Sequence, residues 1–289
     1  MILKANAKIN MFLNVLKKRA DGYHELDMIM QSVDFGDRVC INKTDKGISV
    51  DCGDEFVTEH EEDNTAYRAA KAFFDATGTD GGCDVRIEKV IPQMAGLGGG
   101  SSDCAAVLYG INRLYDMPLK DDELSMLAKS IGADVPFALV GGCRRAGGIG
   151  EILEPVDNNL DCVYLIAKPH AGVSTPAAFR AIDFLPCENP AHAEFCLAAV
   201  VAGDIEGFAR HTRNSLETPA RVLCPEMGEM LDYMKKHSDA AFMTGSGSAV
   251  VGVFSDVHEA AETQKLIGSA AVFSRIARGS SFGVEVIEE

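Results

Sequence analysis

Apolar and polar positions alternate along the first stretch of the chain, as they do in a β-strand whose two faces differ. One face carries Ile9, Met11, Leu13 and Val15. The other carries Lys8, Asn10, Phe12 and Asn14. The pattern predicts a strand with one apolar and one mainly polar face. Further strand-like segments follow over 37–42, 48–52 and 84–90.

Apolar residues at helical spacing alternate with these strands. They predict helices over 65–77, after Ser102 and over 121–131, with Asp63 and Asn64 as capping candidates for the first. Beyond the polar, turn-rich stretch 154–161, strands are expected at 162–169 and 249–254 and in two terminal runs, and helices at 191–200, 204–213, 225–237 and 258–267. Strands and helices interleave in both halves, so we expect an α+β fold with domains 1–156 and 157–289.

Composition limits the kinds of binding partner and the cellular compartment that we expect. The 289 residues include 27 basic and 43 acidic side chains, a formal charge of −16. Such a chain repels polyanions, so we expect no nucleic-acid and no membrane partner. Its nine cysteines form no CxxC pair, and neither a signal peptide nor a run of about 20 apolar residues is visible. We therefore expect a cytoplasmic protein with reduced thiols.

A glycine cluster, IPQMAGLGGGSSD at 91–103, precedes an apolar helical run. Glycine loses the most backbone freedom on folding, so the cluster needs a compensating role. A glycine-rich turn at a helix N-terminus gathers free backbone N–H groups that favour phosphate. The patterns GxxxxGK[ST] and GxGxxG both fail here. From these residues alone, a flexible loop with a Ser-Asp cap remains an equal alternative.

The segment PQMAGLGGGSSD resembles the central motif of the GHMP kinases, a family of small-molecule kinases. Three further segments agree in order and spacing: ANAKINMFLNV, GADVPFALVGG and MTGSGSAVVGVF. With KRADGYHEL, the chain is most similar to the branch that phosphorylates the 2-hydroxyl of a CDP-linked polyol, 4-diphosphocytidyl-2-C-methyl-D-erythritol, in non-mevalonate isoprenoid synthesis. The resemblance implies a ribosomal-protein-S5-domain-2-like N-terminal domain and a ferredoxin-like C-terminal domain, with ATP and substrate between them.

The resemblance also assigns a catalytic pair. By themselves, Lys8 reads as a solvated cation and Asp134 as the cap of a helix opening near Pro136. In the family these positions match the catalytic Lys and Asp. Asp134 would then act as general base toward the substrate hydroxyl, while Lys8 keeps it ionised and stabilises the transferring charge.

Binding residues follow from the same motifs. For ATP the resemblance implies Asn64, Lys89, Pro92, Ala95, Gly96, Leu97, Gly98, Gly99, Gly100, Ser101, Ser102, Thr244, Gly245, Ser246 and Gly247. For substrate it implies Asn10, Gly22, Tyr23, His24, Asp134, Thr175 and Phe179. Tyr23 and Phe179 would stack on the two faces of the cytosine, and His24 would hydrogen-bond its edge. Mg²⁺ is expected as MgATP, held by phosphates and water.

Alternatives remain at this point. Another GHMP kinase of the mevalonate or homoserine type would share the phosphate loop, and an idle relative would only bind nucleotide. Three departures from the family pattern leave the catalytic pair untouched: CRRAGGIGE after Gly142, Ser215 and Cys104. We expect a monomer or weak homodimer.

Overall fold

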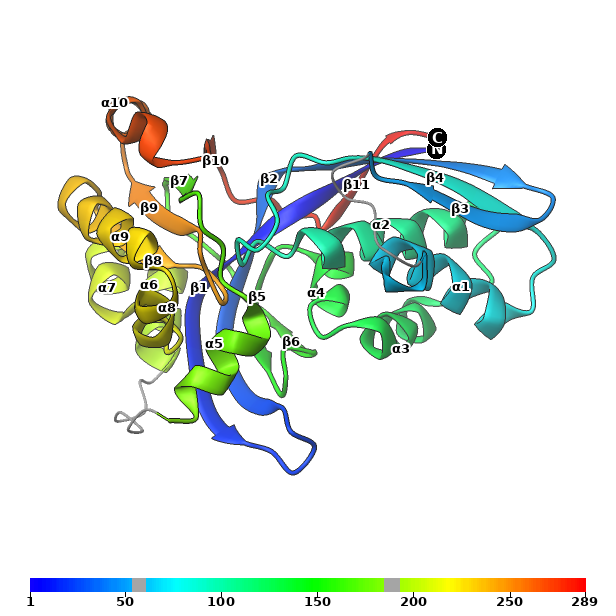
Figure 1. Ribbon diagram of the computed structural model, residues 1–289, viewed down its shortest axis with the longest axis horizontal. Helices are drawn as coiled ribbons and strands as arrows, with labels where there is room; N and C mark the ends of the chain where they lie inside the picture. The colour runs from blue at the N-terminus through cyan, green and yellow to red at the C-terminus, as the bar shows by residue number, and fades with distance from the viewer. Residues whose placement is uncertain (54–60, 185–192) are drawn as a thin grey trace.

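The computed structural model describes residues 1–53, 61–184 and 193–289. The strands of the first part are β1 (Ile2–Lys18), β2 (His24–Thr44), β3 (Gly47–Asp51), β4 (Gly82–Glu88), β5 (Cys143–Gly147) and β6 (Ile152–Pro155). Its helices are the 3₁₀ turn η2 (Glu61–Asp63) and α1 (Thr65–Thr77), α2 (Gly99–Leu114), α3 (Asp121–Ile131) and α4 (Val135–Val140). In Figure 1 these four α-helices lie together on one side of the long sheet.

The second part supplies the remaining elements. Its strands are β7 (Val163–Lys168), β8 (Ala240–Met243), β9 (Val250–Phe254), β10 (Phe273–Ala277) and β11 (Val284–Glu288). Its helices are α5 (Thr175–Ile182), α6 (Ala193–Ala202), α7 (Ile205–His211), α8 (Glu217–Leu223), α9 (Pro225–His237), α10 (Val257–Ile267) and the 3₁₀ turn η3 (Gly268–Ala270). The expected α+β class is confirmed.

Two sheets organise the described residues. The larger has seven strands in the order β11-β1-β2-β4-β3, extended by β5 on β2 and β6 on β5. The smaller has four antiparallel strands in the order β10-β7-β9-β8. The last strand, β11, returns to the first sheet and pairs with β1, so the two chain ends lie side by side (Figure 1). The first sheet is therefore completed by residues at the opposite end of the sequence.

Strand β1 differs from the expected half-buried strand. Residues 5–14 are buried throughout, including Phe12 and Asn14 on the expected polar face. The register with β2 also shifts between Asn10 and Phe12, which breaks the simple alternation. The cause is tertiary, because both faces are covered in the folded chain: Phe12 packs in one apolar cluster and Leu13 in another. The Leu13 N–H also donates to the Arg213 carbonyl at 2.8 Å. Packing on both sides thus overrides the pattern.

Several helices coincide with their sequence patterns, notably α1, α3 and α9. The Asn64 side chain caps α1 by accepting from the Ala66 and Tyr67 N–H groups. Helix α2, however, begins at Gly99 rather than after Ser102, so two of the four glycines of the cluster are helical. Positions 191 and 192 of the helix expected at 191–200 lie outside the described residues.

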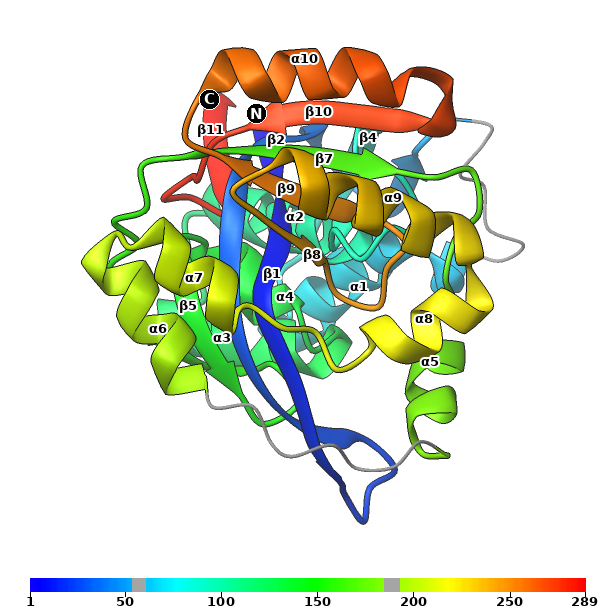
Figure 2. The same cartoon turned by 90° about the vertical axis from the view of Figure 1, so that its left-hand side faces the viewer.

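The end of the β1–β2 hairpin projects beyond the other strands of its sheet (Figure 2). The described cysteines are free thiols, and Cys187 lies outside the described residues. Across the described ranges, none of the helices has the length and apolar character needed to cross a membrane.

Candidate active site

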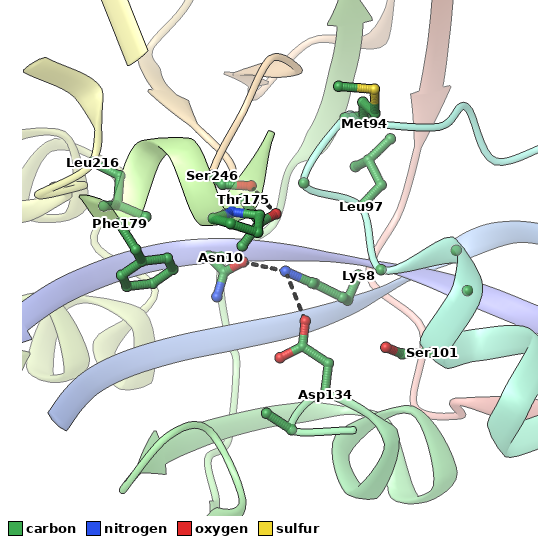
Figure 3. Close-up of a pocket in the computed structure, with 18 of the residues that line it drawn as sticks. Lys8, Asn10, Met94, Leu97, Ser101, Asp134, Thr175, Phe179, Leu216 and Ser246 are labelled. Atoms are coloured by element: carbon green, nitrogen blue, oxygen red, sulfur yellow. Dashed lines mark hydrogen bonds and ion pairs between the residues drawn. The ribbon is translucent and has the colours of Figure 1, made fainter. Parts of the chain in front are cut away.

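One cavity of about 930 Å³ collects most of the predicted site residues. Its walls come from β1, the β1–β2 hairpin, the glycine cluster at 91–103 (hereafter the glycine segment), the start of α4, helix α5 and the loop before β9. In Figure 3 the side chains of Lys8, Asn10 and Asp134 meet at the centre of this space, with Thr175, Ser246 and Phe179 beside them. Segments far apart in the sequence therefore converge here.

Lys8 lies at the centre of this convergence. Its Nζ is 3.5 Å from Asp134 Oδ2 and donates to Asn10 Oδ1 at 2.5 Å (Figure 3). The Lys8 side chain is only 8% exposed, whereas that of Asp134 is 32% exposed. A buried ammonium paired with a carboxylate that solvent can still reach can orient that carboxylate toward an incoming hydroxyl.

Asp134 stands at the N-cap position of α4, yet its side chain makes no capping hydrogen bond. The expectation that it serves as a helix cap is therefore wrong for the side chain. A proline in the first turn of α4 removes one N–H donor that a cap would otherwise satisfy. The Asp134 carboxylate is thus left to face Lys8.

The glycine segment passes directly over Lys8. The Lys8 N–H donates to the Leu97 carbonyl at 3.1 Å. Gly98 has φ +76°, and a Cβ there would lie 3.0 Å from Cγ of Lys8. Gly98 is also the N-cap of α2, so the free N–H groups of the helix start lie next to the Lys8 cation. This arrangement can hold an anionic phosphate chain.

The loop 244–247 lies against the glycine segment. Thr244 is fully buried, and its Oγ1 accepts from the Asn10 N–H at 2.9 Å and donates to the Gly96 carbonyl at 3.4 Å. Asn214 donates to the carbonyls of Met243 and Gly245 at 2.7 and 2.8 Å, which fixes the start of this loop. The Thr175 and Ser246 hydroxyls meet at 2.7 Å across the cavity.

Most of the predicted ATP residues line the cavity: Asn64, Lys89, Pro92, Ala95, Gly96, Leu97, Gly98, Gly99, Gly100, Ser101, Gly245 and Ser246. So do all the predicted substrate residues: Asn10, Gly22, Tyr23, His24, Asp134, Thr175 and Phe179. Ser102, Thr244 and Gly247 do not line it. The Ser102 hydroxyl instead donates to the Asn6 carbonyl at 2.7 Å, which ties α2 to β1.

Lys89 is held by two buried carboxylates beneath the start of α2. Its Nζ contacts Oδ2 of Asp103 at 2.5 Å and Oδ2 of Asp37. The Oδ1 atom of Asp103 has no hydrogen-bond partner among the described residues. Burial raises the pKa of Asp103 to about 7; Lys89 opposes the rise and Asp37 adds to it. No sequence signal marks Asp37, because it occupies an ordinary strand position.

The far end of the cavity is aromatic. The His24 and Phe179 rings stack with centroids 5.3 Å apart and planes at 29°. Tyr23 is 60% exposed at the hairpin tip, and His24 Nε2 is 2.7 Å from Asp183 Oδ1. Sequence reasoning missed Asp183, which follows α5 one helical turn after Phe179; that spacing was its only signal.

The three departures from the family pattern have local structural roles. The Ser215 hydroxyl donates to Asn14 Oδ1 at 2.9 Å and accepts from the Val15 N–H at 3.2 Å. Cys104 is fully buried in α2. Arg145, in the CRRAGGIGE segment, forms two hydrogen bonds with Asp27. None of these contacts involves the Lys8–Asp134 pair.

The donor set around the cavity bears on any metal ion. No group of three or more His, Cys, Asp or Glu side chains that could hold a metal occurs within 1–53, 61–184 and 193–289. Mg²⁺ bound with a nucleotide usually takes most of its ligands from phosphate oxygens and water, which requires no such cluster.

Known proteins resemble this chain along most of its length. A model of the GHMP kinases N terminal domain matches residues 64–142, and a model of the GHMP kinases C terminal region matches 196–267. A 4-diphosphocytidyl-2-C-methyl-D-erythritol kinase of Caldicellulosiruptor saccharolyticus is 41% identical over 90% of both chains. That of Caldicellulosiruptor bescii is 38% identical over 98% of this chain and all of the relative.

Solved structures extend the comparison. A crystal structure of 4-(cytidine 5'-diphospho)-2C-methyl-D-erythritol kinase has a TM-score of 0.79 and 34% identity, covering 97% of this chain and 100% of the other. A homoserine kinase from Cytophaga hutchinsonii has a TM-score of 0.81 at 18% identity over 99% and 97% of the two chains, a likeness of fold alone. The chain therefore belongs to the 4-diphosphocytidyl-2-C-methyl-D-erythritol kinase family, a branch of the GHMP kinases.

Proposed function

We propose that this small-molecule kinase transfers the γ-phosphoryl group of ATP to the 2-hydroxyl of 4-diphosphocytidyl-2-C-methyl-D-erythritol. The observation that carries the proposal is the Lys8–Asp134 pair, 3.5 Å apart in a cavity that also holds the glycine segment and the aromatic end. The relatives named for this activity support the choice of substrate.

Asp134, Lys8 and the start of α2 each have a role in phosphoryl transfer. The Asp134 carboxylate accepts the proton of the 2-hydroxyl as the new O–P bond forms, and the bond from the γ-phosphorus to the ADP oxygen breaks with its electrons on ADP. Lys8 stabilises negative charge on the transferring group, because its ammonium lies between Asp134 and the glycine segment. Backbone N–H groups at the start of α2 bind the phosphates.

Substrate and nucleotide occupy opposite ends of the cavity in this proposal. The cytosine lies among Tyr23, His24 and Phe179, and the polyol contacts Asn10 and Thr175. The nucleotide lies along the glycine segment toward Asn64. Mg²⁺ accompanies ATP and supplies charge neutralisation on the phosphates, with few protein ligands.

We also propose a domain division and an oligomeric state. We place the division of the chain at 156/157, with β11 returned to the first sheet. We expect a cytoplasmic protein. We also expect a monomer or weak homodimer, and sedimentation of the purified protein would measure this oligomeric state.

The test is ADP release, coupled to NADH oxidation, with and without diphosphocytidyl-methylerythritol, together with the product mass. Substrate-dependent ADP and one added phosphoryl group support the proposal. Turnover of mevalonate or homoserine instead would identify another GHMP kinase, and ATP binding without turnover an idle relative.

Variants separate the catalytic pair from the fold. We expect Asp134→Asn and Lys8→Met each to lower kcat by about 10²–10⁴-fold with unchanged unfolding midpoints. Lys4→Met is the matched control. Lys4 lies on the same strand as Lys8 but outside the cavity, and it also pairs with a carboxylate, that of Glu285 at 3.1 Å. Near wild-type turnover in folded Asp134→Asn would refute the assignment.

A further inference from the structure

The carboxylate of Asp183 ties both strands of the β1–β2 hairpin to the end of α5. Its Oδ1 lies 2.7 Å from His24 Nε2, and its Oδ2 forms an ion pair with Lys18. Lys18 and His24 are paired across the hairpin, so a single carboxylate contacts the two strands at the same level. Asp183 itself lines the cavity, and its side chain is 24% exposed.

These contacts determine which atom of the His24 ring carries the proton. Hydrogen bonds from Lys18 and from His24 lower the pKa of Asp183, so its carboxyl group is ionised. An ionised carboxylate can only accept, so His24 Nε2 must be the donor. In the neutral ring, Nδ1 is then left as an acceptor.

The ring is also held in place. One of its faces stacks on Phe179, and the His24 side chain is only 8% exposed. Nε2 is engaged by Asp183, and the structure gives Nδ1 no partner among the described residues. Nδ1 is thus the polar ring atom that remains for a ligand, and an acceptor selects a ligand that donates.

We propose that Asp183 is a specificity-determining positioning residue, which fixes the His24 proton on Nε2 so that Nδ1 accepts a hydrogen bond from the amino group of a cytosine base. Uracil has a carbonyl oxygen in place of that amino group, and two facing acceptors repel each other. The inference rests on the proposed function, since it names the group that this site reads in the CDP-linked substrate.

The kinetic test compares the cytidine substrate with its uridine analogue. In Asp183→Ala we expect the kcat/KM ratio of the cytidine to the uridine substrate to fall about tenfold, through KM of the cytidine substrate. The KM for ATP should stay within about twofold. Lys18→Met is the matched control, because it removes the other partner of the same carboxylate and keeps the bond to His24, so it should retain discrimination.

A spectroscopic test reads the tautomer directly. Nitrogen-15 NMR of the wild type, with the His24 signals assigned by loss in His24→Gln, should show the proton on Nε2. In Asp183→Ala the signals should shift toward a mixture of tautomers. A proton on Nδ1 in the wild type overturns the inference, as does an equal loss for both nucleosides and for ATP in Asp183→Ala.

The two proposals fail differently. A wild-type enzyme that does not turn over the CDP-linked substrate refutes the proposed function. The tautomer, measured on the same protein without substrate, still decides the role of Asp183: Nε2–H supports it and Nδ1–H refutes it.

Discussion

Gly96 is the position where the two glycine-rich loops touch, and replacing it by alanine tests whether that contact builds the phosphate site. Gly96 has φ +74°, and a Cβ there would lie 2.1 Å from the Thr244 carbonyl oxygen. Because real Cβ contacts stay near or above 3.0 Å, the two backbones would have to separate by about 1 Å.

The cost has two parts. A left-handed φ costs an alanine about 1–2 kcal/mol. Separation of the loops also stretches the hydrogen bonds from the Ser248 N–H to Met94 O and from the Ala249 N–H to Ala95 O, at 3.2 and 3.1 Å. At about 1 kcal/mol each, these bring the expected loss in free energy of unfolding to about 3–4 kcal/mol.

Gly78→Ala is the matched control. Gly78 follows α1 with φ +63°, and nothing lies within 4 Å of its added Cβ, so it carries the backbone strain alone. We expect it to lose about 1–2 kcal/mol. Urea unfolding of both variants gives the difference, and titration calorimetry should show at least tenfold weaker ATP binding only in Gly96→Ala. Equal unfolding losses with unchanged ATP affinity would refute the reasoning.

Three further outcomes are expected. Burial raises the pKa of Asp103 to about 7, from an unfolded value near 4. The protonated carboxyl group therefore contributes its full stabilisation below about pH 4, and this contribution is lost as the pH rises through about 7. Asp103→Asn should therefore lower the pH dependence of urea stability between pH 5 and 8, and an unchanged slope would contradict this. Phe73→Ala, at a fully buried ring, should lose about 3–5 kcal/mol in urea unfolding; a loss below about 1 kcal/mol would show that the cavity collapses. Ser102→Ala should lose about 1–2 kcal/mol, since the Asn6 carbonyl loses a buried donor, while ATP affinity stays within about twofold by calorimetry. A large loss of ATP affinity would instead place Ser102 in the nucleotide site.

Local signals in the sequence determined the elements whose causes are themselves local. Helix α1 follows from its apolar spacing and from Asn64, whose side-chain oxygen accepts from the N–H groups two and three residues on. Helices α3 and α9 also span the ranges that their patterns predict. The motif resemblance brought Lys8 and Asp134 into consideration, because motif segments keep their order and spacing along the chain.

Tertiary structure decided everything that depends on distant contacts. Burial of both faces of β1 comes from two apolar clusters that distant segments build, and the completion of the first sheet requires β11 from the other end of the chain. The loop is shorter than expected, because α2 already begins at Gly99. The Ser102 hydroxyl in its first turn donates to the Asn6 carbonyl of β1.

The site shows the same division. Sequence placed Lys8 on a strand and Asp134 before a helix, but only folding brings Nζ and Oδ2 to 3.5 Å across more than a hundred residues. The spacing of Asp183 after Phe179 did not indicate its role, because its partner His24 lies on a hairpin far from it in the chain. Periodicity reports which face of one element is apolar; which side chains meet in the cavity depends on how separate elements pack, and no local pattern encodes that.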